Sequence, residues 1–255
     1  MRRSRGYHSS ANQFHGDLSE YLQNDHLFFV SLDDVEWQLS ARRYFNNTNA
    51  LRLQNFEMLA IRMAMPQQTD FPLPFDLPQP VDDGAADHLG GMLMPQISLP
   101  STADRLVDLS NLVGLRTVLY CYPMTGVPGK PLPQGWDRIP GARGCTPQAC
   151  GFRDHHQELS ELKADVFGLS TQTTEYQREM ADRVHLPFQI LSDAEFKLCD
   201  ALHLPTFEVD GMRLVKRLTL IVRARRIEHL FYPVFPPNES ADQVMRWLRA
   251  HQVPD

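Results

Sequence analysis

Along residues 84–255 the apolar positions alternate between short continuous runs and runs of helical spacing. Short runs rich in β-branched and aromatic residues predict strands at residues 116–122, 166–170, 188–191, 206–209, 213–222 and 227–232. Apolar residues three and four positions apart predict helices at residues 147–163, 173–184, 194–202 and 240–251. Strands separated by helices require parallel crossovers, whereas the late pair of adjacent strands requires an antiparallel edge. The pattern therefore predicts an α/β fold with a mixed central sheet and helices on both faces.

Residues 1–80 show a different pattern. Residues 33–46 and 50–64 have helical character. Residues 66–80 contain five prolines, which favour an extended linker over a helix. No motif that carries chemistry precedes this linker. We therefore expect a partly helical N-terminal extension at residues 1–80, serving as an appendage or a dimerisation arm, and a separate domain at residues 81–255.

The composition is typical of a soluble protein with a substantial core. Of its 255 residues, 42% are hydrophobic and 22% are charged. The net charge of −6 gives no electrostatic footprint for nucleic acid, and no apolar run approaches the length of a membrane span. The basic start, Met-Arg-Arg-Ser-Arg, lacks the apolar core of a secretory signal. Four cysteines, two of them isolated, do not make a disulfide scaffold. We therefore expect a cytoplasmic protein, with neither nucleic acid nor a membrane as a partner.

Two cysteines five positions apart carry the main chemical signal. Cys145 and Cys150 lie where a turn-rich segment gives way to a predicted helix, and Pro147 suits the first helical turn because a proline there loses no hydrogen bond. Cys145 is thereby placed at the helix N-terminus, where unpaired N–H groups and the helix dipole favour a thiolate. Since the thiolate is the nucleophilic form of cysteine, Cys145 is a candidate reactive thiol.

The spacing also bears on whether the two sulfurs form a bond. In an intact helix, residues five apart have Cα atoms roughly 8–9 Å apart, whereas a disulfide needs them within about 7 Å. A bond between Cys145 and Cys150 therefore requires the first helical turn to unwind, which suits a bond made and broken during turnover. Two other interpretations stay open: a pair of small buried apolar side chains, or a zinc site completed by His155 and His156.

The run from Gly144 to Asp154, Gly-Cys-Thr-Pro-Gln-Ala-Cys-Gly-Phe-Arg-Asp, resembles the active-site helix of peroxiredoxins of the bacterioferritin-comigratory (Q) type. The resemblance extends over residues 90–250 through four further segments in the family's order: residues 122–123 before the helix, and residues 167–171, 186–193 and 216–222 after it. It implies a thioredoxin-like fold. It also implies a thiol peroxidase that reduces hydrogen peroxide or organic hydroperoxides.

The resemblance further implies roles for particular residues. Cys145 is expected to be the peroxidatic cysteine, which becomes a sulfenic acid, and Cys150 the resolving cysteine, which condenses with it to a disulfide. Arg217 is expected to stand over the thiolate and orient the peroxide; the alternative is a strand-edge arginine with its head group in water. A thioredoxin-like dithiol is expected to reduce the disulfide. The resemblance implies no cofactor or metal, and a monomer or a homodimer.

One departure from the family pattern concerns a hydroxyl group. The family places Pro-x-x-x-Thr/Ser-x-x-Cys at the active site, whereas here Pro123 lies 22 residues before Cys145 and the residue three before the cysteine is alanine. The inserted loop, residues 126–143, contains four prolines. We expect this loop to close over Cys145 and to bring Thr125 into the missing role; Thr146 is a second candidate.

Other functions stay open at this point. A thiol–disulfide oxidoreductase or redox sensor with little peroxidase turnover would use the same cysteines. A non-catalytic thioredoxin-fold interaction protein would meet its partner through the N-terminal extension and the long loop. Cys121, in a predicted strand, and Cys199, in a predicted helix, are expected to be inert core residues. Consumption of peroxide coupled to a dithiol donor separates the three functions.

Overall fold

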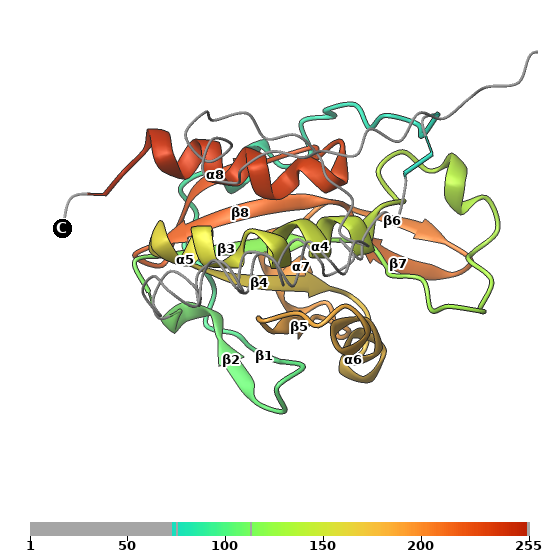
Figure 1. Ribbon diagram of the computed structural model, residues 1–255, viewed down its shortest axis with the longest axis horizontal. Coiled ribbons are helices and arrows are strands. Elements are labelled where there is room, and N and C mark those ends of the chain that lie inside the picture. The colour runs from blue at the N-terminus through green and yellow to red at the C-terminus, as the bar shows by residue number, and fades with distance from the viewer. Residues whose placement is uncertain (1–72, 75, 113, 254–255) are drawn as a thin grey trace, which may run out of the picture. The chain divides into compact units, whose positions relative to one another are not determined.

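The computed structural model describes residues 73–74, 76–112 and 114–253 (Figure 1). The helices predicted at residues 33–46 and 50–64 lie outside these residues, as does most of the predicted proline-rich linker. Of that linker, residues 76–80 form neither helix nor strand. The division into an extension at residues 1–80 and a domain at residues 81–255 stays a prediction.

A five-stranded sheet forms the centre of the described part. Its strands, in spatial order, are β5 (Ile190–Ser192), β4 (Ala164–Ser170), β3 (Arg116–Cys121), β8 (Leu218–Arg223) and β9 (Arg226–Phe231). β4 runs parallel to β3 and β5, whereas β8 runs antiparallel to β3 and β9. The predicted mixed sheet is confirmed. Its parallel half comes from strand–helix–strand crossovers, and its antiparallel half from the β8–β9 hairpin.

Helices cover both faces of this sheet, as predicted (Figure 1). One face packs against α4 (Cys145–Asp154), α5 (His156–Glu161), α6 (Thr174–Arg183) and α8 (Ser240–Ala250), and the other against α7 (Lys197–Leu202) and the 3₁₀ helices η1 (Asp87–Leu89) and η2 (Leu109–Asn111). Side chains alternate along β3: Val118 and Tyr120 point into the first core, and Leu119 and Cys121 into the second. Among the described residues, no helix is long and apolar enough to span a bilayer.

Two hairpins lie outside the central sheet. β1 (Ser98–Pro100) pairs with β2 (Leu106–Asp108), and β6 (Thr206–Val209) pairs with β7 (Met212–Val215), both antiparallel. The β1–β2 hairpin is absent from the sequence prediction because each strand has only three residues and is mostly exposed. Two further 3₁₀ helices, η3 (Trp136–Arg138) and η4 (Pro237–Glu239), precede α4 and α8 respectively.

Two predicted elements are each divided in the structure. The helix predicted at residues 147–163 belongs to α4 and α5, which are separated at His155, where the backbone leaves the helical region (φ −99°, ψ 12°). The strand predicted at residues 213–222 is β7 followed by β8, with Lys216 and Arg217 between them. The N–H of Lys216 bonds to the Pro205 carbonyl at 2.8 Å instead of joining the central sheet. This interruption releases the next residue, Arg217, from strand pairing.

Candidate active site

Cys145 is the first residue of α4, and its side chain is 3% exposed. Gly144 precedes it in a left-handed conformation, with φ of 94°, that favours glycine. A side chain at Gly144 would also overlap the ring of Pro237 and touch Leu73. The chain therefore enters the helix through a turn that suits only glycine. This turn sets Cys145 among the unpaired N–H groups of the first helical turn.

Arg217 brings its guanidinium to the sulfur of Cys145. It lies between β7 and β8, is 3% exposed, and places Nη2 at 3.1 Å from Cys145 Sγ. Its head group is buried rather than in water. The structure thus brings together two of the predicted site residues, which are 72 positions apart in the chain. A guanidinium at this distance stabilises negative charge on a sulfur.

The end of the loop before α4 holds Arg217 in place. The carbonyl oxygens of Gly141 (3.3 Å from Nε), Ala142 (3.3 Å from Nη2) and Arg143 (3.0 Å from Nη2) accept hydrogen bonds from the guanidinium. The Ala142 carbonyl also accepts from the Cys145 thiol at 3.5 Å. Within the described residues, no carboxylate pairs with Arg217. Because carbonyl oxygens carry only partial charges, the net charge of the guanidinium stays available to an anion at Cys145.

Gln148 is a site residue that the sequence prediction omits. It is 0% exposed in α4; its Oε1 accepts a hydrogen bond from Arg217 Nη1, and its Nε2 donates to Ser240 Oγ at 3.2 Å. The sequence feature that could have identified Gln148 is its spacing from Cys145. Three residues after Cys145 on a helix, its side chain lies on the same face as the cysteine. Gln148 thus fixes the guanidinium from a second direction and ties the site to α8.

Cys150 lies in the same uninterrupted helix as Cys145, and both are free thiols. Its side chain is 2% exposed, and burial raises the pKa of the Cys150 thiol above its ordinary value. Residues five apart in an intact helix are beyond the reach of a disulfide. The described helix is therefore that of the reduced protein, and a bond between the two sulfurs requires α4 to unwind at its start.

Cys121 and Cys199 belong to the opposite core. Cys121 points from β3 away from α4, Cys199 lies in α7, and both are 0% exposed. Burial raises the pKa of both thiols well above the ordinary range, and the nearby Asp193 raises both further. Their predicted place in the core is confirmed.

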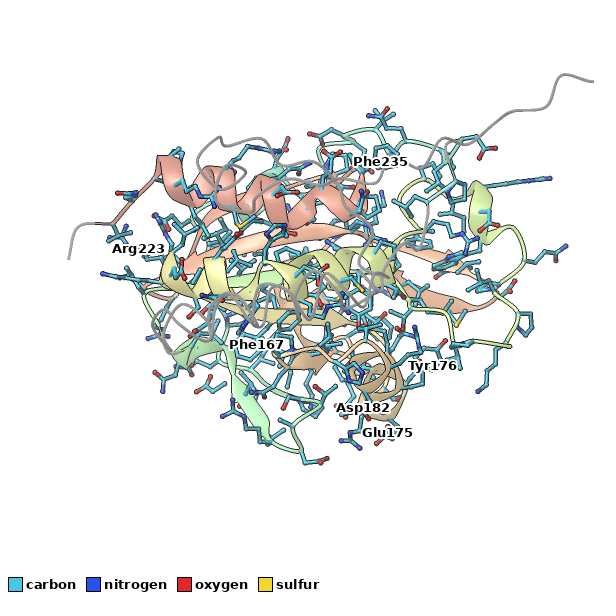
Figure 2. All side chains as sticks on the ribbon, in the orientation of Figure 1. Phe167, Glu175, Tyr176, Asp182, Arg223 and Phe235 are labelled. Carbon is cyan, nitrogen blue, oxygen red and sulfur yellow. The ribbon has the colours of Figure 1, made fainter. Side chains whose placement is uncertain are left out.

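Thr125 is buried, but among the described residues it makes no hydrogen bond with Cys145. Its N–H donates to Gln172 Oε1 at 3.1 Å, and its hydroxyl donates to the same oxygen at 3.4 Å. Its carbonyl accepts from the hydroxyl of Tyr176, a residue of α6 (Figure 2), at 2.9 Å. The backbone of Thr125 is thus well fixed, whereas a hydroxyl bond of this length is weak and leaves the group free for a better partner. Its role at Cys145 stays a prediction.

Phenol rings line the sheet beneath α4. Tyr120 and Tyr122 are both 0% exposed and stack 5.9 Å apart, and Tyr120 stacks on Phe152 at 4.5 Å. Burial raises the pKa of both phenols well above the ordinary range, so both rings stay neutral. In such dry surroundings the attraction between a guanidinium and a thiolate is stronger than in water.

The zinc interpretation finds no support in the described part of the chain. No group of three or more His, Cys, Asp or Glu side chains there could hold a metal ion. His155 bonds to Glu158 at 2.8 Å and lies 3.6 Å from Asp242, and His156 packs on Phe188 with ring centroids 5.8 Å apart. The two histidines therefore contact acidic and aromatic side chains and do not join the cysteines in a metal site.

The redoxin family matches residues 89–245 of the chain. Peroxiredoxin Bcp of Escherichia coli is 30% identical over 165 residues, which cover 63% of this chain and 96% of the bacterial protein. The chain belongs to the redoxin family, as a peroxiredoxin of the Bcp and Q type. Chloroplastic peroxiredoxin Q of Sedum lineare is 29% identical to this peroxiredoxin over 161 residues, which cover 63% of this chain and 77% of the plant protein.

Solved structures agree with this assignment. Peroxidoxin BcpB from Mycobacterium tuberculosis aligns with a TM-score of 0.52 and 25% identity, over 64% of this chain and 98% of that one. A PrxQ mutant structure from Xylella fastidiosa, at 18% identity, matches in fold with a TM-score of 0.50, over 70% of this chain and 98% of that one. The thioredoxin-like fold predicted for this peroxiredoxin is confirmed.

The inserted loop of this peroxiredoxin, residues 126–143, packs on the β6–β7 hairpin. Trp136, 3% exposed, shares a small core with Ala142 and Val209, and the N–H of Gln134 bonds to Asp210 Oδ2 at 2.9 Å. The loop is thus a folded part of the molecule, and its last three residues carry the carbonyl oxygens that hold the guanidinium. The end of the predicted linker also reaches this loop, because a side chain at Gly141 would touch Pro80.

Proposed function

We propose that this peroxiredoxin is a thiol peroxidase that reduces hydrogen peroxide or organic hydroperoxides with Cys145 as the nucleophile. The observation that supports the proposal is the 3.1 Å contact between Arg217 Nη2 and Cys145 Sγ at the N-terminus of α4. A fixed positive charge close to the sulfur favours the thiolate, which is the nucleophilic form of cysteine. Arg217 supplies this charge without a competing carboxylate among the described residues.

In the first step the Cys145 thiolate attacks the terminal oxygen of the hydroperoxide. A bond forms between sulfur and that oxygen as the O–O bond breaks, so that sulfur is oxidised to a sulfenic acid and the peroxide is reduced to an alcohol or water. The leaving oxygen gains negative charge and takes up a proton. Arg217, which carries donors toward the sulfur, stabilises the charge that develops on the reacting oxygens.

In the second step Cys150 resolves the sulfenic acid. Its thiol condenses with Cys145–SOH, a disulfide forms, and one water molecule leaves. Because both cysteines lie in α4, this step begins with the unwinding of the first turn, which also brings the buried Cys150 thiol into contact with water. A thioredoxin-like dithiol then reduces the disulfide by exchange and is itself oxidised. We assign this cycle to the cytoplasm, where such dithiols are kept reduced, and to a monomer or a homodimer.

We further propose that Thr125 supplies the hydroxyl that the family pattern places three residues before the cysteine. Its present bond to Gln172 is long, 3.4 Å, so a bound peroxide can compete for the hydroxyl. Thr125→Val should slow the oxidation of Cys145 by about 10²–10³ if this donor acts as in an oxyanion hole, and Ala142→Thr should recover part of the loss. An unchanged rate in Thr125→Val would remove the hydroxyl from the mechanism.

The test of the main proposal is steady-state consumption of hydrogen peroxide and of an organic hydroperoxide with a thioredoxin-like dithiol donor. Cys145→Ser should abolish consumption, and the matched change Cys199→Ser, at a cysteine equally buried, should keep it. Full activity in Cys145→Ser would refute the proposal. If the parent protein reduces disulfides but consumes neither peroxide, the proposed peroxidase function is replaced by that of a thiol–disulfide oxidoreductase.

The role of Cys150 has a separate test. In Cys150→Ser, peroxide should oxidise Cys145 once and turnover should then stop, because no neighbouring thiol can condense with the sulfenic acid. Peptide mapping of the oxidised parent protein should find a link between Cys145 and Cys150. A dominant link to Cys121 or Cys199 would contradict the assignment.

A further inference from the structure

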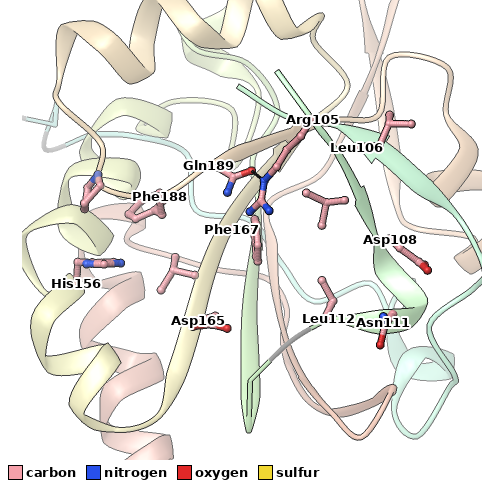
Figure 3. A pocket seen from close by; sticks show the side chains of 13 residues that line it. Arg105, Leu106, Asp108, Asn111, Leu112, His156, Asp165, Phe167, Phe188 and Gln189 are labelled. Carbon is pink, nitrogen blue, oxygen red and sulfur yellow. Dashed lines mark hydrogen bonds between the residues drawn. The ribbon is translucent and has the colours of Figure 1, made fainter. Parts of the chain in front are cut away.

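A groove of about 430 Å³ lies between β4, the β1–β2 hairpin and α5 (Figure 3). We call it the β4-edge groove. It shares no lining residue with the site around Cys145 and is lined by residues 105–108, 111–112, 165–167 and 187–189 and by His156. Its volume lies in the range of sites that take a small ligand or a few side chains of a peptide.

The groove opens onto an unpaired edge of β4. β3 pairs with residues 164–169, whereas β5 pairs only with residues 168–170. In a parallel ladder, alternate residues direct both backbone groups to the same neighbour. The N–H of Gly168 bonds to the Gln189 carbonyl at 3.1 Å, so the even-numbered residues of β4 face the β5 side. Val166 therefore directs its N–H and C=O into the groove, and within the described residues neither group has a backbone partner on that side.

The chain itself leaves this edge unpaired, although Val166 as a whole is only 4% exposed. Phe188, which would lie opposite Val166 in a longer β5, packs instead against His156 and Tyr120, with ring centroids 5.8 and 5.9 Å away. The outer side of β5 is already occupied, because Ile190 exchanges hydrogen bonds with the N–H and hydroxyl of Thr102 at 3.0 and 3.1 Å. The unpaired backbone of Val166 thus lies next to the paired residues of β4 and β5. The packing of Phe188 prevents β5 from extending to cover it.

The side chains around the edge indicate what would pair there. Asp165 and Phe167 lie two positions apart and therefore on one face of β4. Asp165 is exposed and its carboxylate has no ion pair or hydrogen bond in the described part, whereas Phe167 is half-buried. Across the groove Leu106 is 69% exposed and Asp108 makes no ion pair with any described residue. Figure 3 shows these side chains around the hollow. Arg105, also in the lining, donates from Nε to Gln189 Oε1 at 3.0 Å. The edge thus combines a free carboxylate, an apolar surface and one arginine.

We propose that the β4-edge groove binds an extended segment of a partner polypeptide, which adds a strand to the sheet beside Val166. The segment carries Lys or Arg opposite Asp165 and an apolar side chain opposite Phe167, and these two residues are therefore two positions apart. Nucleic acid does not fit this edge, because it has no row of amide N–H and C=O groups at strand spacing that could pair with Val166. A small cation would use the carboxylates but not the backbone of Val166. This inference does not depend on the proposed peroxidase function.

The probe is the peptide acetyl-Lys-Thr-Val-Thr-Lys-amide, whose basic–x–apolar pattern is the same in either direction. Added to the whole chain labelled for NMR, it should shift the backbone amide signal of Val166 more than that of Gly168, which is already paired. A control peptide with the same side chains but every backbone nitrogen methylated cannot donate and should bind at least about tenfold more weakly. Asp165→Lys should weaken binding by at least about threefold.

The matched control variant is Asp182→Lys, which makes the same charge change at an exposed position of α6 (Figure 2). It should leave the affinity within about twofold, since Asp182 does not line the groove and exposed charges are screened by salt. Equal binding of the methylated peptide, an equal loss in both charge variants, or no shift at Val166 at millimolar peptide would each overturn the proposal.

Discussion

Arg116 and Arg217 are both buried, 4% and 3% exposed, and each stands at the start of a strand. Arg116 begins β3 and forms a bidentate ion pair with Glu228, at 2.7 and 2.8 Å. Arg217 directly precedes β8 and is surrounded by carbonyl oxygens, the amide of Gln148 and the thiol of Cys145. Since β3 and β8 are antiparallel, the two guanidiniums lie at opposite ends of the sheet.

The two arginines differ in whether a carboxylate neutralises them. An arginine paired with a carboxylate stabilises the fold, whereas an unpaired buried arginine is available to a reacting anion. Arg116 is neutralised in the folded protein, and its guanidinium also lies over the ring of Trp247 at 4.9 Å. Arg217 has hydrogen-bond partners but no counter-ion in the described residues, and in the proposed function its counter-ion is the thiolate of Cys145. Burial alone does not distinguish the two side chains. The partner's charge does.

The largest effect is expected from Arg217→Ala. Removing the cation should slow the first oxidation of Cys145 by about 10²–10³, because the developing negative charge loses its main stabilising group. Stopped-flow oxidation and the ultraviolet absorbance of the thiolate measure the effect. The matched control is Arg213→Ala, at an arginine paired with Asp200 near the surface, which should oxidise at the parent rate. An unchanged rate in Arg217→Ala would place this arginine in the same structural class as Arg116.

Arg116→Met should show the reverse behaviour. It leaves Glu228 without its main partner and should lower the free energy of unfolding by about 2–3 kcal/mol. The loss is moderate because Glu228 is 24% exposed and keeps a contact with Arg223 at 3.2 Å. Urea unfolding measures the loss, and the oxidation rate of Cys145 should stay within about twofold. A large fall in that rate in a folded variant would end the distinction between the two arginines.

Gln148→Leu tests whether the orientation of the Arg217 guanidinium matters as well as its charge. It removes one acceptor from Arg217 while keeping the guanidinium, so we expect a loss of about tenfold in the oxidation rate. The control is Gln157→Leu, in the next helix, α5, where the glutamine side chain bonds to the exposed Glu161. Equal rates in the two variants would mean that the loop carbonyls alone hold Arg217.

The smallest effect concerns pH. The hydrogen bond from Arg116 holds the pKa of Glu228 below its usual value. A carboxyl whose pKa is lowered on folding stabilises the protein above its unfolded pKa, and this contribution is lost as the pH falls through the folded pKa. Between about pH 6 and about pH 3 the parent protein should therefore lose about 0.5–1 kcal/mol more unfolding free energy than Glu228→Gln. Parallel urea titrations at several pH values measure this, and identical slopes would contradict it.

Apolar periodicity predicts the strands and the mixed sheet because burial on two faces leaves long apolar runs. It does not predict the break before β8. Leu214, Val215 and Leu218 continue the run across Lys216 and Arg217, and the break depends on a backbone bond to Pro205 that sequence periodicity cannot show. The family motif placed Arg217 at the head of a strand, and the structure shows how the break releases its side chain.

The partners of Arg217 are the part of the site that the sequence could not supply. Backbone carbonyls have no sequence signature, and a glutamine on a helix is ordinarily exposed. The buried partners of Gln148 are Arg217 and Ser240, which lie 69 and 92 residues further along the chain. Thr125 is predicted because the family's hydroxyl residue is replaced here by Ala142 and the reaction benefits from a hydroxyl near the sulfur. Its actual partner, Gln172, lies 47 residues further on and could not be read from the motif.

The loop carbonyls at Cys145 come from residues that precede it, whereas three other residues of its surroundings follow it in the chain. Arg217 comes 72 residues later, Ser240 bonds to Gln148 from 92 residues away, and Pro237 packs against Gly144. A ribosome releases the chain N-terminus first, so Cys145 emerges long before these partners. Until Arg217 has left the ribosome, the guanidinium that activates Cys145 in the proposed mechanism is absent from the nascent chain. Under that mechanism the folded protein carries the reactive thiol and the growing polypeptide does not, so the synthesis of this region is protected from oxidation at Cys145.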